Sequence, residues 1–282
     1  MPSVPPFANL RHLHLNGPLM GVRNLVNVIV APELEDVELV CQGNLDDDID
    51  LGVDIPEGNS DVLYVMFNLF SRRNALSLRR FHFTHTDADV PLLPDPAATA
   101  TQATGPGSPL LELRALQDVM ILQALRDVKY YAEPNILGWV NAWPRLRTLA
   151  LSALVVFPET LQYIARTCPQ VESLTVWKLS TKFVESLSRL EASSAFGPIG
   201  EPSGGRPALR AFCVHDYFMP SSSIEIGRVA CFFDSLFHQL DAERFWVPCL
   251  CHWPRPRGPS PFHGVRQKLK ELQLDDEMYP FL

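Results

Sequence analysis

The chain has 282 residues, of which 46% are apolar and 10% aromatic, and its formal net charge at pH 7 is −8. A chain of this length and composition can bury a sizeable core, which excludes a disordered protein. Nucleic acid is excluded as a partner, because neutralising phosphates requires clustered Lys and Arg and this chain is acidic. No stretch approaches the roughly 18 uninterrupted apolar residues of a membrane-spanning helix, so no membrane partner is expected.

Cysteine usage indicates a reducing compartment. The sequence has 6 scattered cysteines and no Asn-x-Ser/Thr glycosylation site, which is typical of reduced thiols in a cytoplasmic or nuclear protein. We expect Cys41, Cys168, Cys213 and Cys231 to be buried, since cysteine without a disulfide is among the most buried residue types.

A short phrase with the pattern L-x-x-L-x-L recurs along the chain, with Val or Phe sometimes replacing Leu. The alternation of apolar residues inside each phrase predicts a short strand. Between adjacent phrases, the middle apolar residue moves from position 13 to 37 and from 149 to 174. Spacings of about 24 or 25 residues are typical of leucine-rich repeats. The matches are Leu10/Leu13/Leu15, Leu34/Val37/Leu39, Leu78/Phe81/Phe83, Leu146/Leu149/Leu151, Val171/Leu174/Val176, Leu209/Phe212/Val214 and Leu269/Leu272/Leu274.

In the first half of the chain, strands are predicted at 10–15, 34–39 and 78–83. An acidic insertion near 43–60 precedes a helix for which Ser60 or Asp61 is the expected N-cap, and apolar residues continue at helical spacing to Phe70. A low-complexity insertion follows near 94–109. Between 110 and 130 the repeat register stays open, because LQDVMI at 116–121 and LRDVKY at 125–130 both fit but are too close for two repeats.

In the second half, strands are predicted at 146–151, 171–176, 209–214 and 269–274, with a weaker unit in QLDAERFWV at 239–247. Helical spacing appears at 158–168 and 224–240. Insertions near 192–207 and 248–265 are rich in turn residues and are interpreted as loops. Alternating strands and helices predict an α/β fold: a single leucine-rich-repeat solenoid over 1–282, with parallel strands on its inner face and helices outside.

The run NAWPRLRTLALSALVVFPETLQYIARTCPQVESLTV at 141–176 resembles the repeat region of fungal F-box/leucine-rich-repeat proteins. In that family, a helix ends in an aromatic residue or Cys, followed by Pro and L-x-x-L-x-L. Residues 28–39 and 209–237 are similar to other units of the family. The resemblance implies repeats that present a protein target to a ubiquitin ligase, while a separate N-terminal F-box holds the ligase adaptor.

The position of the first repeat separates this chain from that family pattern. It begins at Leu10, which leaves no room for an F-box, so a ligase adaptor is expected as a partner only if a longer form contains one. Because apolar phrases lie near both ends, we expect that the sequence is part of a longer protein or that a partner caps its first repeat.

Two stretches carry metal-binding residue types. DDDIDLGVDIPE at 46–57 approaches a calcium-binding EF-hand loop, but Leu51 replaces the Gly of the turn, so a solvated acidic insertion is expected. Cys249, Cys251, His252 and His263 are suitable zinc ligands, but they lack the usual paired spacing. We therefore expect no metal and no cofactor.

The sequence contains neither a G-x-S-x-G nucleophile elbow nor a Walker-type phosphate-binding loop. Because a repeat solenoid offers an extended surface rather than a closed pocket, no enzymatic activity is predicted. The inner-face positions differ from repeat to repeat, as recognition of one partner requires. The candidate partner-binding residues are His12, His14, Asp36, Glu38, Arg80, His82, Thr148, Ser173, Thr175, Cys213, Glu271 and Gln273.

The function predicted from these patterns is a protein-interaction scaffold. Target recognition similar to that of the substrate-binding repeats of an F-box protein is the first interpretation. The alternative is a free-standing leucine-rich-repeat regulator of another enzyme, such as a small GTPase. An F-box segment upstream would favour the first, and recovery of a GTPase in a pull-down would favour the second.

Overall fold

The structure, a computed structural model, describes residues 7–42, 59–85, 108–123, 133–192, 208–216, 222–245 and 263–278. Strands and helices alternate along the chain, and the strands pair in parallel wherever the pairing is described, so the predicted α/β class is confirmed. The chain forms two compact units, 1–146 with 150–153 and 147–149 with 154–282. None of the described helices is long and apolar enough to cross a bilayer.

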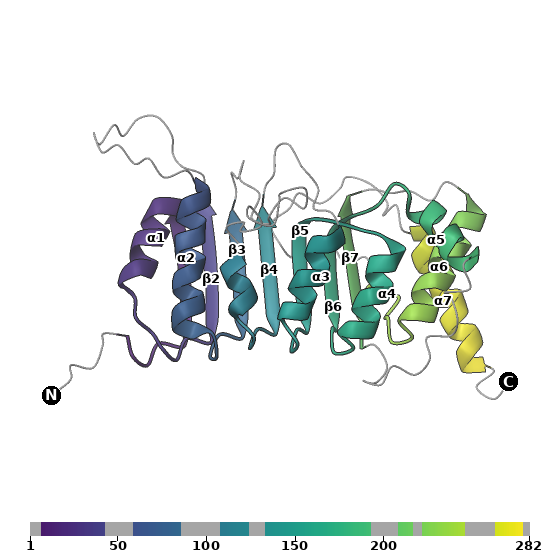
Figure 1. The fold of residues 1–282 in the computed structure, drawn as a ribbon. Coiled ribbons are helices and arrows are strands. Elements are labelled where there is room, and N and C mark those ends of the chain that lie inside the picture. Colours follow the sequence, from purple (N-terminus) through teal and green to yellow (C-terminus); the bar gives the residue numbers. More distant parts are fainter. Residues whose placement is uncertain are drawn as a thin grey trace. The chain divides into compact units, whose positions relative to one another are not determined.

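The first unit contains strands β1 (His12–Pro18), β2 (Asp36–Gln42), β3 (Arg80–His85) and β4 (Asp118–Gln123), which pair in chain order. Its helices are α1 (Leu19–Val28), α2 (Asn59–Asn74) and α3 (Glu133–Ala142), with the 3-10 helix η1 (Ser108–Glu112). Figure 1 shows α1 and α2 side by side in front of the strands, and these two helices contact each other.

The second unit contains strands β6 (Ser173–Leu179) and β7 (Ala211–Asp216), and β5 (Thr148–Val156) lies where the two units divide. Its helices are α4 (Pro158–Thr167), α5 (Phe183–Ala192), α6 (Ser223–Leu236) and α7 (His263–Met278). Phe245 forms an isolated parallel bridge to Phe212. The weaker unit predicted at 239–247 therefore does supply a strand-like contact beside β7.

The recurring phrase places equivalent apolar residues side by side on neighbouring strands. In the second unit, Leu174 pairs with Phe212 and Val176 with Val214. Strand β4 resolves the open register in favour of the phrase at 116–121, while the phrase at 125–130 lies outside the described residues. In the first unit, the two rows of paired residues are Leu13–Val37–Phe81–Val119 and Leu15–Leu39–Phe83–Ile121.

A repeated turn leads into the phrases. The N–H of Leu146 donates to the carbonyl of Trp143 at 3.0 Å, and that of Val171 donates to the carbonyl of Cys168 at the same distance. Pro144 and Pro169 occupy the second position of these turns, where the fixed φ of proline suits the geometry. The recurring sequence is thus a turn followed by a buried apolar residue and a strand.

Strand starts are aligned by shared carbonyls. The Arg11 carbonyl accepts the N–H groups of Glu35 and Asp36 at 2.9 and 3.0 Å, and the Glu172 carbonyl accepts those of Arg210 and Ala211 at 2.8 and 3.0 Å. Because one carbonyl binds two successive N–H groups of the next strand, neighbouring strands begin in register in both units.

The core of each unit is rich in aromatic rings. In the first, the ring centroid of Phe67 lies 5.6 Å from Phe81 and 5.3 Å from Phe83, both edge to face, an arrangement that aromatic quadrupoles favour. In the second, the Phe233 ring lies 4.9 Å from Phe212 and 5.2 Å from Phe245. These buried rings fix the strands, whose opposite face then carries the variable side chains.

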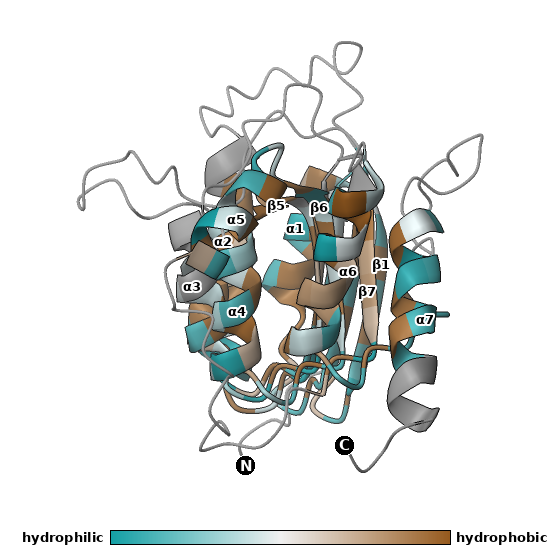
Figure 2. Ribbon diagram, turned by 90° about the vertical axis from the view of Figure 1, so that its right-hand side faces the viewer, coloured by the Kyte–Doolittle hydropathy of each residue, from teal (hydrophilic) through white to brown (hydrophobic). Residues whose placement is uncertain are grey.

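The strand predicted at 269–274 is wrong, because these residues lie in α7. Val265 and Leu269 are fully buried one helical turn apart, and α7 packs against α6. Figure 2 shows apolar and polar residues succeeding one another along α7. Leu269 and Leu272 fit helical spacing as well as the phrase, and neither Pro nor Gly interrupts the run 265–278.

The predicted insertions fall largely outside the described residues. Described elements begin inside three of them: α2 at Asn59, η1 at Ser108 and α7 at His263. The acidic stretch 46–57 and the residues Cys249, Cys251 and His252 also lie outside the described residues, so their interpretations stay predictions.

Candidate functional site

The candidate site is the polar face of the first unit. Along β2 and β3, residues at alternate positions are exposed or half-buried while their neighbours are buried, and on β1 the exposed His12 and His14 flank the buried Leu13, because successive strand side chains point to opposite faces. Register brings polar residues of different strands together. We call the resulting row the charged ladder: His12, Asp36, Arg80 and Asp118.

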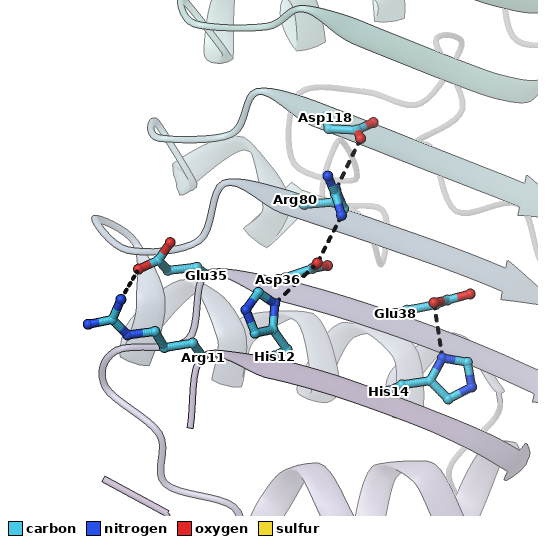
Figure 3. A network of polar contacts seen from close by, with 8 residues as sticks. All are labelled: Arg11, His12, His14, Glu35, Asp36, Glu38, Arg80 and Asp118. Carbon is cyan, nitrogen blue, oxygen red and sulfur yellow. Dashed lines mark hydrogen bonds and ion pairs between the residues drawn. The ribbon is translucent and has the colours of Figure 1, made fainter. Parts of the chain in front are cut away.

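Arg80 connects the charged ladder from its centre. One terminal nitrogen lies 3.0 Å from Asp36 Oδ2, and Nε lies 3.2 Å from Asp118 Oδ2. On the other side of Asp36, His12 Nδ1 lies 3.4 Å from the same oxygen. Figure 3 shows these side chains in line across four strands. A basic group next to each carboxylate therefore orients the row.

A second row runs beside the charged ladder along the same strands. His14 Nδ1 lies 3.0 Å from Glu38 Oε2, as Figure 3 shows. His82 pairs with Glu38 in the strand register, but its Nε2 lies 3.3 Å from Asp118 Oδ1, at ion-pair distance without hydrogen-bond geometry. His82 thus reaches across to the charged ladder.

These ion pairs contribute little to the stability of the fold. The side chains of His12, His14 and Arg80 are 76%, 58% and 52% exposed, and exposed pairs are worth only about 0 to 1 kcal/mol each. Their value lies in orientation, because a side chain held in one position can match a partner with little loss of conformational freedom.

The predicted residues of the second unit are placed differently. Thr148 and Ser173 are half-buried, whereas Thr175 and Cys213, predicted on an exposed inner face, are each only 8% exposed. Leu174, Thr175 and Val176 are buried in succession, so β6 is covered on both faces there. Thr175 and Cys213 are therefore corrected to buried residues.

Glu271 and Gln273 are also corrected, because both lie in α7 instead of on a strand. Glu271 is exposed and pairs with Lys268 at 2.9 Å, which lowers the pKa of its carboxyl through this hydrogen bond. Gln273 donates from Nε2 to the Leu240 carbonyl at 2.6 Å. Gln273 thus fastens α7 to the segment after α6.

Sequence reasoning missed two charged residues of this face. Asp118 precedes Val119 just as Asp36 precedes Val37, but the open register between 110 and 130 concealed the correspondence. Arg11 lies one residue before β1 and pairs with Glu33 and Glu35 at 3.7 and 3.6 Å. Arg11 could have been found from its position, because it directly precedes a predicted strand and its carbonyl binds two N–H groups of the next strand.

The cysteines differ in their surroundings. Burial raises the pKa of the Cys41 thiol to about 12 and that of Cys168 to about 11, and Cys213 is buried as predicted. Cys231, predicted to be buried, is exposed. Its neighbours Ala230 and Phe232 occupy the buried side of α6, which turns Cys231 toward solvent.

We expect these differences to appear in thiol labelling. With a maleimide reagent at pH 8, Cys231 should react in the folded protein, while Cys41 and Cys168 should react only after unfolding, because the thiolate is the nucleophile and burial disfavours it. Peptide mass spectrometry assigns the label to each cysteine. Rapid labelling of Cys41 in the folded chain would contradict its burial.

Among the described residues, no group of three or more His, Cys, Asp or Glu side chains is arranged to hold a metal ion. Comparison of the sequence with protein-family models gives no match, and comparison with curated proteins gives none either.

Proposed function

We propose that the chain is a leucine-rich-repeat solenoid that recognises a protein target through the polar face of β1 to β4. The repeated turn, the shared carbonyls and the in-register apolar rows support a repeating unit in both parts of the chain. Short repeats that bury their apolar faces against their neighbours are the basis of a solenoid.

The observation that carries the proposal is the charged ladder. Its members are a histidine, an arginine and two aspartates, which come from four strands and are oriented by contacts with one another. The opposite side of the same strands is a buried core, so substitutions in the ladder leave the scaffold intact. Oriented side chains of both charges that are at least partly exposed on a rigid sheet are suited to selecting one partner.

Binding fits this face better than catalysis. Its polar side chains are spread along neighbouring strands, and the carboxylates of Asp36 and Glu38 pair with imidazoles and with the Arg80 guanidinium. Within a ubiquitin ligase, as the family resemblance suggests, such a face would hold the substrate. Contact with a ligase adaptor is proposed only for a longer form that includes an F-box.

Reversing two charges should remove target binding. In Asp36→Lys combined with Glu38→Lys, lysines replace the carboxylates that pair with His12, Arg80 and His14, so the face becomes basic. We expect recovery of the specific target to fall by about tenfold or more. Affinity purification with quantitative mass spectrometry, run beside the unchanged chain, measures this loss.

The matched control is Arg72→Glu, a charge reversal at an exposed position of α2. It should leave target recovery and the circular dichroism spectrum unchanged. If Arg72→Glu removes the target while the double variant retains it, the helical side binds and the proposal is wrong. Ligase subunits should appear only with a longer form, so their absence there would overturn the ligase role alone.

A further inference from the structure

The outer edge of β1 is open in the part of the chain that the structure describes, where β1 pairs with β2 on its other side. The Arg11 carbonyl, one residue before β1, bonds to the β2 side. Backbone groups of successive strand residues point to opposite edges, so those of His12, His14 and Asn16 point to the open edge. Such groups are a template for a further strand.

The two histidines of β1 lie beside this edge, and their rings are turned toward carboxylates of β2. Each directs Nδ1 toward a carboxylate of β2, His12 to Asp36 and His14 to Glu38, and Figure 3 shows both rings in these positions. These contacts engage Nδ1 of each ring, so Nε2 is the ring nitrogen that remains for a side chain of an added strand.

The charge around the histidines favours a cationic side chain. Glu33 and Glu38 have side chains that are 57% and 50% exposed, and Asp36 and Glu35 lie between them along the chain. Arg11 and Arg80 are already engaged with carboxylates. The face therefore has an excess of acidic groups, in a chain whose net charge is −8.

The opposite face at this edge is apolar. Leu15 is only half-buried, although Leu39 and Phe83 of the same row are fully buried. On α1, Leu25 and Val28 are 49% and 63% exposed, and Figure 1 shows α1 at the end of the first unit with α2 on one side. An added strand would cover Leu15 with its own apolar side chains, since alternate residues point to this face.

We propose that the open edge of β1 binds an extended segment of a partner protein by strand addition. The segment carries Lys or Arg at the alternate positions beside His12 and His14, and apolar residues between them. Backbone hydrogen bonds supply affinity in this mode of recognition, and the alternating side chains supply selectivity. This edge site is additional to the target recognition assigned to the charged ladder.

A short fluorescent peptide in which Lys and Val alternate is the probe, and fluorescence anisotropy with the full chain measures its binding. A peptide with Glu in place of Lys tests the charge preference. Two Lys–Val peptides, N-methylated on one or the other set of alternate amides, test backbone pairing. We expect the Glu peptide and one of the two N-methylated peptides to bind about tenfold or more weakly than the unmodified Lys–Val peptide. If both N-methylated peptides bind as tightly as the unmodified one, simple charge attraction replaces strand addition.

Protein variants locate the site. His12→Lys combined with His14→Lys should weaken binding of the Lys–Val peptide by about tenfold and strengthen that of the Glu–Val peptide. His238→Lys, a matched change at an exposed position of the second unit, should alter neither. Hydrogen exchange on the complex should show new protection at 12–16.

Three further outcomes would overturn the inference: no binding of the Lys–Val peptide, protection confined to another segment, or equal effects of the two lysine variants. A dimer that buries β1 at the working concentration, detected by sedimentation, would assign the edge to a second copy instead. Each of these results leaves the charge-reversal test at Asp36 and Glu38 unaffected, so the two proposals fail separately.

Discussion

Replacing Leu174 with Asp is expected to destabilise the chain more than any other single change considered. Leu174 is fully buried on β6 and pairs with Phe212 on β7. Removing its side chain costs about 3 to 5 kcal/mol through lost burial and the cavity left behind, and a carboxylate without a partner adds to this cost. We expect the free energy of unfolding, measured in urea, to fall by at least that amount.

Leu174→Met is the matched control, because a hydrophobic replacement of similar volume usually costs less than about 1.5 kcal/mol. If only Leu174→Asp is strongly destabilised, the loss comes from placing a carboxylate in the core and not from a general sensitivity of β6 to substitution. An unchanged urea midpoint for Leu174→Asp would show that the middle residue of this phrase is not a core residue.

Replacing Trp143 with Ala should produce the second large loss, this time in the first unit. Trp143 is fully buried, its Nε1 donates to the Leu110 carbonyl at 3.0 Å, and its ring lies 5.0 Å from that of Trp139 in an edge-to-face arrangement. Truncating a buried Trp costs about 3 to 5 kcal/mol, and the Leu110 carbonyl would lose its partner. Thermal and urea unfolding measure the loss.

Leu76 offers the comparison for Trp143, since it is 91% exposed and Leu76→Ala should change stability by less than about 0.5 kcal/mol. Trp143→Phe should fall between, because it keeps a ring but loses the hydrogen bond to η1. If all three variants unfolded alike, the side chain of the first residue of the repeated turn would have no structural role.

The strands were predictable because the phrase carries its own register. Leu13, Val37 and Phe81 occupy the same position of successive phrases and pair directly in the sheet. Helices α2, α4 and α6 also follow from apolar spacing. By contrast, α1 begins directly after Pro18 without a side-chain cap, so no local start signal preceded it.

The errors arose where tertiary packing decided between local alternatives. The pattern of Leu269, Leu272 and Leu274 suits a strand and a helix equally, and packing against α6 selects the helix. Alternation predicts that Thr175 and Cys213 point away from the face that carries Leu174 and Phe212. It does not reveal whether that second face of the strand is also covered. Burial on the second face depends on residues distant in sequence.

The candidate site was predictable in part for the same reasons. His12, Asp36 and Arg80 follow from the phrase register, and the structure brings them together. Asp118 could not be assigned while two registers remained between 110 and 130. The orientation of the rings, with Nδ1 toward β2, depends on contacts between strands that no sequence pattern contains.

Carboxyl footprinting of the chain with its captured target tests target recognition by the polar face most directly. The reagent modifies exposed carboxylates, and mass spectrometry reads each site with and without the target. We predict protection of Glu38, Asp36 and Asp118 on the polar face, and unchanged labelling of Glu185 on α5, which is exposed and distant in sequence. Protection of Glu185 with undiminished labelling of Glu38 would contradict the account.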